Sequence, residues 1–128
     1  MSNASILVVE DDNIVAMELK QILDDMGYRV IDTASNAEKA IRIAGEQKPD
    51  LILMDIRLKG PMDGVEAARV IVSKYGIPLI YLTGLTDKGT IRRAKETGAF
   101  CIIMKPFAEN DLIGKIRAAL KKNNSILN

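Results

Sequence analysis

Short, almost uninterrupted apolar runs alternate along this chain with longer stretches in which apolar residues recur at helical spacing. The runs lie at residues 6–9, 51–54, 79–82 and 100–104. Strands that lack a polar alternation are typical of a parallel sheet that is covered on both of its faces. Residues 28–33 form a more mixed run, which favours a strand at an edge of the sheet.

The stretches between the runs have the periodicity and the ends of helices. After Asp12, apolar residues recur every three or four positions until Gly27, which predicts a helix stop. A fourth helix is expected over residues 86–97, where Gly98 ends it, and a fifth contains the apolar positions of residues 112–120.

Two further helices are indicated by capping boxes, in which a short polar side chain and a glutamate three residues later satisfy each other's backbone amides. The pairs are Ser35 with Glu38 and Asp63 with Glu66. The order of elements is therefore strand, then helix, repeated five times.

Strands that alternate with helices of this length pair in parallel through right-handed crossovers. The expected fold class is α/β, a (βα)₅ three-layer sandwich with a five-stranded parallel sheet. The chain has 128 residues and shows no linker or internal repeat, so we expect one domain over residues 1–128. Its core is expected at about residues 5–122, followed by a polar C-terminal tail at 123–128.

Composition narrows the possible functions. Lys and Arg number 18, Asp and Glu number 17, and the net charge of +1 argues against direct binding to nucleic acid or to an anionic membrane. The single cysteine, Cys101, excludes an internal disulfide; no signal peptide or membrane-length apolar run is apparent, so a cytoplasmic protein is expected. Histidine is absent, so any chemistry depends on carboxylates, hydroxyls and lysine.

Reactive side chains gather just past the expected strand ends. Glu10 and Asp11 follow the first strand, Asp55 the third, Thr83 the fourth and Lys105 the fifth. Open parallel sheets bind ligands at the carboxyl ends of their strands. If the first and third strands are neighbours, the three acidic side chains converge on one small volume.

Converging carboxylates repel one another unless a cation lies among them. Oxygen ligands without His or Cys select Mg²⁺, with Mn²⁺ as an alternative. A carboxylate beside such an ion can attack a phosphoryl group, whose oxygens the Lys105 ammonium and the Thr83 hydroxyl could then contact. Taken singly, these residues also have structural interpretations: Asp11 or Asp12 could cap a helix, and Asp55 could be a solvated loop acid.

Together, Glu10-Asp11, Asp55, Thr83-Gly84 and Lys105-Pro106-Phe107 resemble the receiver domain of two-component response regulators. Each motif follows the strand after which that family carries it, and the resemblance covers roughly residues 6–121. It implies the flavodoxin-like strand order 2-1-3-4-5 and a cis peptide bond before Pro106.

The same resemblance implies a role for each acidic position. Asp55 would be the phosphoacceptor and also a ligand of Mg²⁺. Asp11 would bind the metal directly, Glu10 would hold a metal-bound water, and the backbone carbonyl of Arg57 would complete the protein's share of the coordination.

Thr83 would be the switch hydroxyl and Lys105 the lysine that pairs with the phosphate. The sequence departs from the family's usual pattern in three places. Ile102 stands where the family often has Tyr or Phe, so a switch that couples Thr83 to residue 102 would be muted or would use an aliphatic rotamer change. Gly84 stands where Ala is frequent, and the loop at residues 57–61 is longer and lacks the usual Met-Pro.

The expected function is therefore that of a phosphoacceptor regulator rather than an enzyme. The resemblance implies that the phosphoryl donor is a histidine kinase or a phosphotransfer protein. Because the chain has no histidine, the donor residue would lie outside it. Phosphorylation would switch the face formed by the fourth helix, the fifth strand and the fifth helix. That face would then control a partner or self-association as a homodimer.

Three other functions fit the sequence less well. A receiver-like adaptor that is not phosphorylated would lack one of the acids or the lysine, and none is missing. A phosphatase of the haloacid-dehalogenase type needs a second aspartate two residues after the first, where this chain has Arg57. A phosphate-binding loop at residues 84–90 fails because Thr90 stands where the lysine is required.

Overall fold

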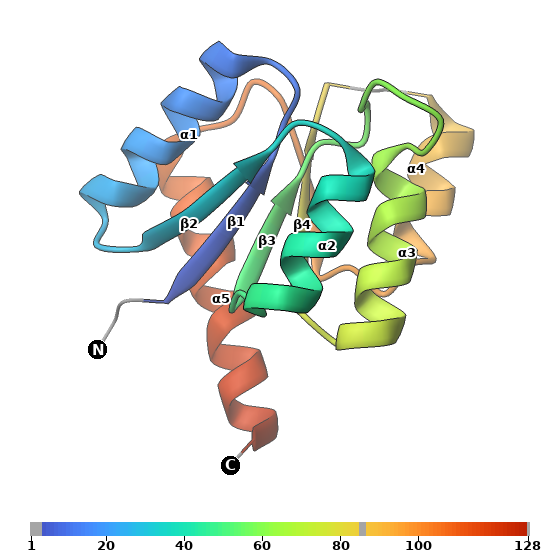
Figure 1. Ribbon diagram of the computed structural model, residues 1–128. Helices are drawn as coiled ribbons and strands as arrows, with labels where there is room; N and C mark the ends of the chain where they lie inside the picture. The colour runs from blue at the N-terminus through green and yellow to red at the C-terminus, as the bar shows by residue number, and fades with distance from the viewer. Residues whose placement is uncertain (1–3, 85–86, 128) are drawn as a thin grey trace.

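The computed structural model describes residues 4–84 and 87–127, the last five of them by their backbone alone (Figure 1). Strand and helix alternate five times, as the sequence predicts. The elements are β1 (Ser5–Val9), α1 (Asn13–Asp25), β2 (Arg29–Ala34), α2 (Ala37–Gln47), β3 (Leu51–Met54), α3 (Gly64–Tyr75), β4 (Leu79–Thr83), α4 (Lys88–Lys95), β5 (Cys101–Met104) and α5 (Glu109–Leu127).

The five strands form one parallel sheet in the order β2-β1-β3-β4-β5, which confirms the expected fold class and strand order. Strands β1, β3 and β4 are buried along their whole length because helices cover both faces of the sheet. β2 is mostly half-buried, as expected for an edge strand. Phe100 precedes β5 rather than beginning it, and Thr83 is the last residue of β4.

The sheet separates two hydrophobic cores (Figure 1). Alternate residues of one strand point to opposite faces. In β1, Leu7 and Val9 therefore pack with α2, α3 and α4, whereas Ile6 and Val8 pack with α1 and α5. This division places α1 and α5 on one side of the strand ends and α3 and α4 on the other.

Two helix starts match the sequence and one does not. Asp63 and Glu66 form the predicted capping box of α3. The box predicted for Ser35 and Glu38 is wrong, because the helix begins one residue later than that pair requires. Asn36 is the N-cap of α2, and its side-chain oxygen accepts a hydrogen bond of 2.8 Å from the amide of Lys39.

The remaining helices refine the expected boundaries. Asp12 caps α1, so its structural interpretation is confirmed. α4 is capped by Asp87 and ends at Lys95, which is shorter than the predicted 86–97, and Thr86 lies outside the described residues. α5 continues to Leu127, so the backbone is helical where the sequence suggested a tail. No helix among the described residues is long and apolar enough to cross a membrane.

Gly64 lets the start of α3 approach the backbone of Asp55 and Ile56, the two residues that follow β3. The amide of Gly64 donates a 2.9 Å hydrogen bond to the carbonyl oxygen of Ile56. A Cβ at this position would overlap the carbonyl oxygen of Asp55 and lie 2.8 Å from the Cα of Ile56. Because both neighbours are backbone atoms, they cannot move aside without shifting Asp55.

We expect Gly64→Ala to lower the free energy of unfolding by about 3 kcal/mol, since a methyl group would be forced into closely packed backbone. Chemical denaturation measures this change. Gly114→Ala in α5 is the control, because a Cβ there meets nothing within 4 Å, and it should leave the protein as stable or slightly more stable. Equal stability of the two variants would contradict the close approach.

Candidate functional site

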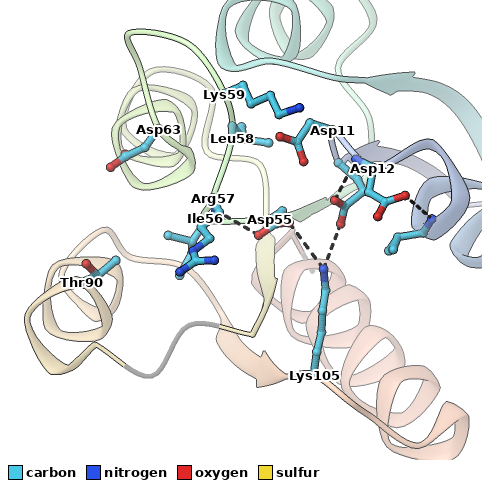
Figure 2. A pocket seen from close by; sticks show the side chains of 12 residues that line it. Asp11, Asp12, Asp55, Ile56, Arg57, Leu58, Lys59, Asp63, Thr90 and Lys105 are labelled. Atoms are coloured by element: carbon cyan, nitrogen blue, oxygen red, sulfur yellow. Dashed lines mark hydrogen bonds and ion pairs between the residues drawn. The ribbon is translucent and has the colours of Figure 1, made fainter.

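The candidate site is an open cleft of about 590 Å³ at the carboxyl ends of the strands (Figure 2). Loops after β1, β3 and β5 and the first turn of α4 line it. This is the edge of the sheet where the sequence places its reactive side chains. The cleft is formed mainly by charged residues, which suits a charged ligand.

An acidic cluster occupies the floor of the cleft. Carboxylate oxygens of Glu10, Asp11 and Asp55 lie within 4.8 Å of one another. Glu10 is 4% exposed and Asp55 is 8% exposed, whereas Asp11 is half-buried. The expected convergence of the three acids is confirmed, and it follows from β1 and β3 being neighbours in the sheet.

Lys105, which follows β5, extends its ammonium group to the acidic cluster. Its Nζ lies 3.0 Å from Oε1 of Glu10 and 3.4 Å from Oδ2 of Asp55 (Figure 2). The peptide bond between Lys105 and Pro106 is cis, as the resemblance implied. The amide of Lys105 also donates to the carbonyl oxygen of Thr83 at 2.8 Å, which fixes the lysine relative to β4.

The buried charges shift each other's ionisation. Burial raises the pKa of Glu10, the hydrogen bond from Lys105 lowers it, and the charge of Asp55 raises it, with a net increase above 4.5. Folding stability therefore falls as the pH rises from that unfolded value through the raised folded value. Burial alone would lower the pKa of Lys105, but the hydrogen bond to Glu10 and the charge of Asp55 outweigh it and raise the pKa, so the ammonium stays protonated.

The carboxylate of Asp55 is held from a second direction. Its Oδ1 accepts a 3.0 Å hydrogen bond from the amide of Arg57, and its own amide donates to the carbonyl oxygen of Val9 at 2.9 Å. The side chain is therefore oriented between the loop after β3 and Lys105, and it faces the cleft. Arg57 lines the cleft as well, and the role predicted for its carbonyl remains a prediction.

The two positions assigned to a switch lie deeper. Thr83 is fully buried at the end of β4, and Ile102 is half-buried in β5. Ile102 pairs with Tyr81, whose hydroxyl is 2.9 Å from the hydroxyl oxygen of Thr97, just past α4. Thr97 also donates to the carbonyl oxygen of Ala94 at 2.7 Å, so β4 is tied to the end of α4.

Three residues that line the cleft were not predicted from the sequence to do so. Lys59 and Thr90 line it, from the loop after β3 and from α4 respectively (Figure 2). Asp63, the cap of α3, also lines it, and its Oδ2 lies 3.5 Å from Nη2 of Arg93. This ion pair depends on the tertiary packing of α4 beside α3, which the sequence alone does not indicate.

The donor set of the acidic cluster fits a hard divalent cation. Three carboxylates within 4.8 Å offer only oxygen, with one more acidic side chain, Asp12, nearby as a helix cap. Mg²⁺ prefers a few carboxylates and keeps several waters, which the open cleft admits. The residues present therefore fit the metal that the sequence implies.

Comparison with known proteins gives one family. Residues 6–117 match the family described as the response regulator receiver domain. The chain is 33% identical over 121 residues to the transcriptional regulatory protein PdtaR of Mycobacterium tuberculosis, covering 94% of this chain and 58% of that protein. It is 38% identical to the DNA-binding response regulator MtrA of Mycobacterium leprae, covering 93% and 52%. The chain thus spans little more than half the length of these relatives.

Solved structures agree with this assignment. The signal receiver domain of a modulated diguanylate cyclase from Desulfovibrio desulfuricans G20 superimposes with a TM-score of 0.91 at 35% identity, over 96% of this chain and 98% of that one. A CheY-like response regulator receiver domain protein from Methanospirillum hungatei JF-1 gives a TM-score of 0.89 at 30% identity, over 97% and 98%.

The crowded acids predict a cost to stability when no metal is bound. In the presence of a chelator, Asp11→Asn should raise the free energy of unfolding by about 1 kcal/mol and the melting temperature by about 4 °C, because it removes one of three close like charges. Thermal melting followed by circular dichroism measures this. Glu18→Gln, an exposed position on α1, removes the same charge outside the cluster and should change little. Destabilisation by Asp11→Asn would contradict the repulsion.

Proposed function

The chain belongs to the response regulator receiver domain family, and we propose that it accepts a phosphoryl group on Asp55. The observation that supports this most directly is the position of the Asp55 carboxylate. It faces an open cleft while its two oxygens are held by the Arg57 amide and the Lys105 ammonium. A carboxylate oriented in this way is a nucleophile whose attack needs little rearrangement.

The proposed step is a transfer between two proteins. An oxygen of Asp55 attacks the phosphorus of a phosphohistidine, the bond from phosphorus to the imidazole nitrogen breaks, and its electron pair remains on that nitrogen. The product is an acyl phosphate on Asp55. The ammonium of Lys105, 3.4 Å from Oδ2 of Asp55, then pairs with a phosphate oxygen.

The acidic cluster supplies the metal part of this proposal. Asp11 and Asp55 would hold Mg²⁺ directly, Glu10 through a water, and Arg57 through its carbonyl. The bound ion would offset the negative charge of the phosphoryl oxygens as they approach these carboxylates. Without it, three acids would face the incoming phosphoryl group, and the ion pairs of Lys105 reach only Glu10 and Asp55, so we expect transfer to depend on the metal.

The donor is proposed to be a histidine kinase or a phosphotransfer protein. No residue in this chain is a histidine, so the donor imidazole lies outside these 128 residues. The openness of the cleft supports this arrangement, because the side chain of another protein must reach Asp55.

Phosphorylation is proposed to act on α4 through β4. The Thr83 hydroxyl would turn toward the phosphate, and the change would reach α4 through the bond between Tyr81 and Thr97. Ile102, beside Tyr81, would adjust by an aliphatic rotamer change. The output is a change in the face of α4, β5 and α5, which binds a partner or a second copy of the chain.

We expect the protein to gain the mass of one phosphate when it is incubated with acetyl phosphate and Mg²⁺. Intact mass spectrometry measures the adduct. Asp55→Asn should carry none, because the amide cannot form the acyl phosphate, and a chelator should remove the adduct from the wild type.

The matched control is Asp50→Asn, an acid at the opposite end of β3 that hydrogen-bonds to Ser5; it should be phosphorylated like the wild type. Absence of an adduct on folded wild-type protein under all conditions would contradict the proposal and favour a receiver-like adaptor. An adduct that persists in Asp55→Asn would place the acceptor elsewhere.

The switch is tested separately from the acceptor. Thr83→Ala should still be phosphorylated but should lose the change in amide hydrogen exchange that phosphorylation causes in α4, because it lacks the hydroxyl that donates to the phosphate. Thr83→Ser keeps that hydroxyl and should retain the change. An unaltered α4 response in Thr83→Ala would contradict the proposed role of Thr83.

A further inference from the structure

A second lysine reaches the phosphoryl cleft from the side opposite to Lys105. Lys59 lines the cleft, and its side chain extends toward Asp11 (Figure 2). It belongs to the loop after β3 that is longer than is usual in the family. The two lysines therefore flank the acidic cluster, one from the end of β5 and one from this loop.

The residues on either side of Lys59 restrict the path of the loop. Leu58 is 8% exposed and packs in the core shared with α2 and α3, which anchors the loop on one side. Gly60 has a φ of 111°, a conformation that L side chains rarely adopt, and it turns the chain directly after the lysine. Lys59 is thus held at the rim of the cleft while its flexible side chain extends over it.

Asp11 is the acid that this lysine faces. The ammonium of Lys105 is occupied by Glu10 and Asp55. Within residues 4–84 and 87–122, Asp11 forms no hydrogen bond or ion pair with another side chain. Lys59 is accordingly the cation placed to offset the charge of Asp11 when the cleft holds no metal.

We propose that the ammonium of Lys59 weakens the binding of a divalent cation at Asp11. Lys59 would thereby set how much metal the cleft holds before phosphorylation. An ammonium near Asp11 repels a divalent cation twice as strongly as it would repel a monovalent cation at the same distance. The inference rests on the proposed function, because it assumes that Asp11 binds the metal.

After phosphorylation the sign of the interaction reverses. The acyl phosphate carries about two negative charges where the Asp55 carboxylate carried one, so the cleft gains about one negative charge. The ammonium of Lys59 then stands beside a metal whose charge is largely offset, and it is attracted to the phosphate. Lys59 thus opposes the metal-bound, unphosphorylated cleft and favours the phosphorylated one.

The test is a direct measurement of metal binding, with no phosphoryl donor present. Free Mn²⁺ is followed by electron paramagnetic resonance during titration of the protein, and Mg²⁺ is then added to displace it. Lys59→Met, which keeps the length of the side chain without its charge, should bind both ions about three- to tenfold more tightly than the wild type at low salt. The difference should shrink at high salt because the lysine is exposed.

Two variants control for charge and for chemistry. Lys121→Met removes the same charge from an exposed position far along α5 and should bind the ions as the wild type does. Lys59→Arg keeps the charge and should also resemble the wild type.

The outcomes separate this inference from the function on which it rests. If the wild type binds Mn²⁺ and Asp11→Asn does not, the metal site stands. Equal affinities for Lys59→Met and Lys121→Met would then overturn the role of Lys59 alone. If the folded wild type binds no ion, the proposed metal site and the role of Lys59 both fail.

Discussion

The contact of one ammonium with two buried carboxylates holds the cleft together. Lys105 reaches Glu10 and Asp55 at 3.0 and 3.4 Å, and both acids are less than a tenth exposed. A buried carboxylate without a partner is costly, and Lys105 gives both acids a cationic partner. The cis bond before Pro106 and the bond from the Lys105 amide to Thr83 place the lysine at that point. The orientation of the Asp55 carboxylate therefore depends in part on a residue that lies 50 positions away in the sequence.

Most of the fold follows from local patterns in the sequence. The apolar runs identify β1, β3, β4 and β5, because strands covered on both faces carry few polar side chains. The more mixed run of β2 fits its place at the edge of the sheet. The cap of α3 was predictable because Asp63 and Glu66 each accept a hydrogen bond from the other's backbone amide, an interaction that depends only on their spacing in the sequence. The cap of α2 was not, because Ser35 and Asn36 are adjacent capping residues and the choice between them depends on how the chain leaves β2.

The candidate site also contains features that could be predicted from the sequence and features that could not. The convergence of Glu10, Asp11 and Asp55 could be predicted, since each directly follows a strand and neighbouring parallel strands end together. The ion pair between Arg93 and Asp63 could not, because it depends on how α4 packs beside α3. The position of Lys59 could not be predicted for a related reason. Its place over the cleft depends on the path of an irregular loop, which no periodicity describes.

The division of the core by the sheet has a consequence for how such a protein can diverge. Among the described residues, the buried side chains that pack with α1 and α5 form one cluster, and those that pack with α2, α3 and α4 form another. Substitutions can therefore accumulate on one side without disturbing packing on the other.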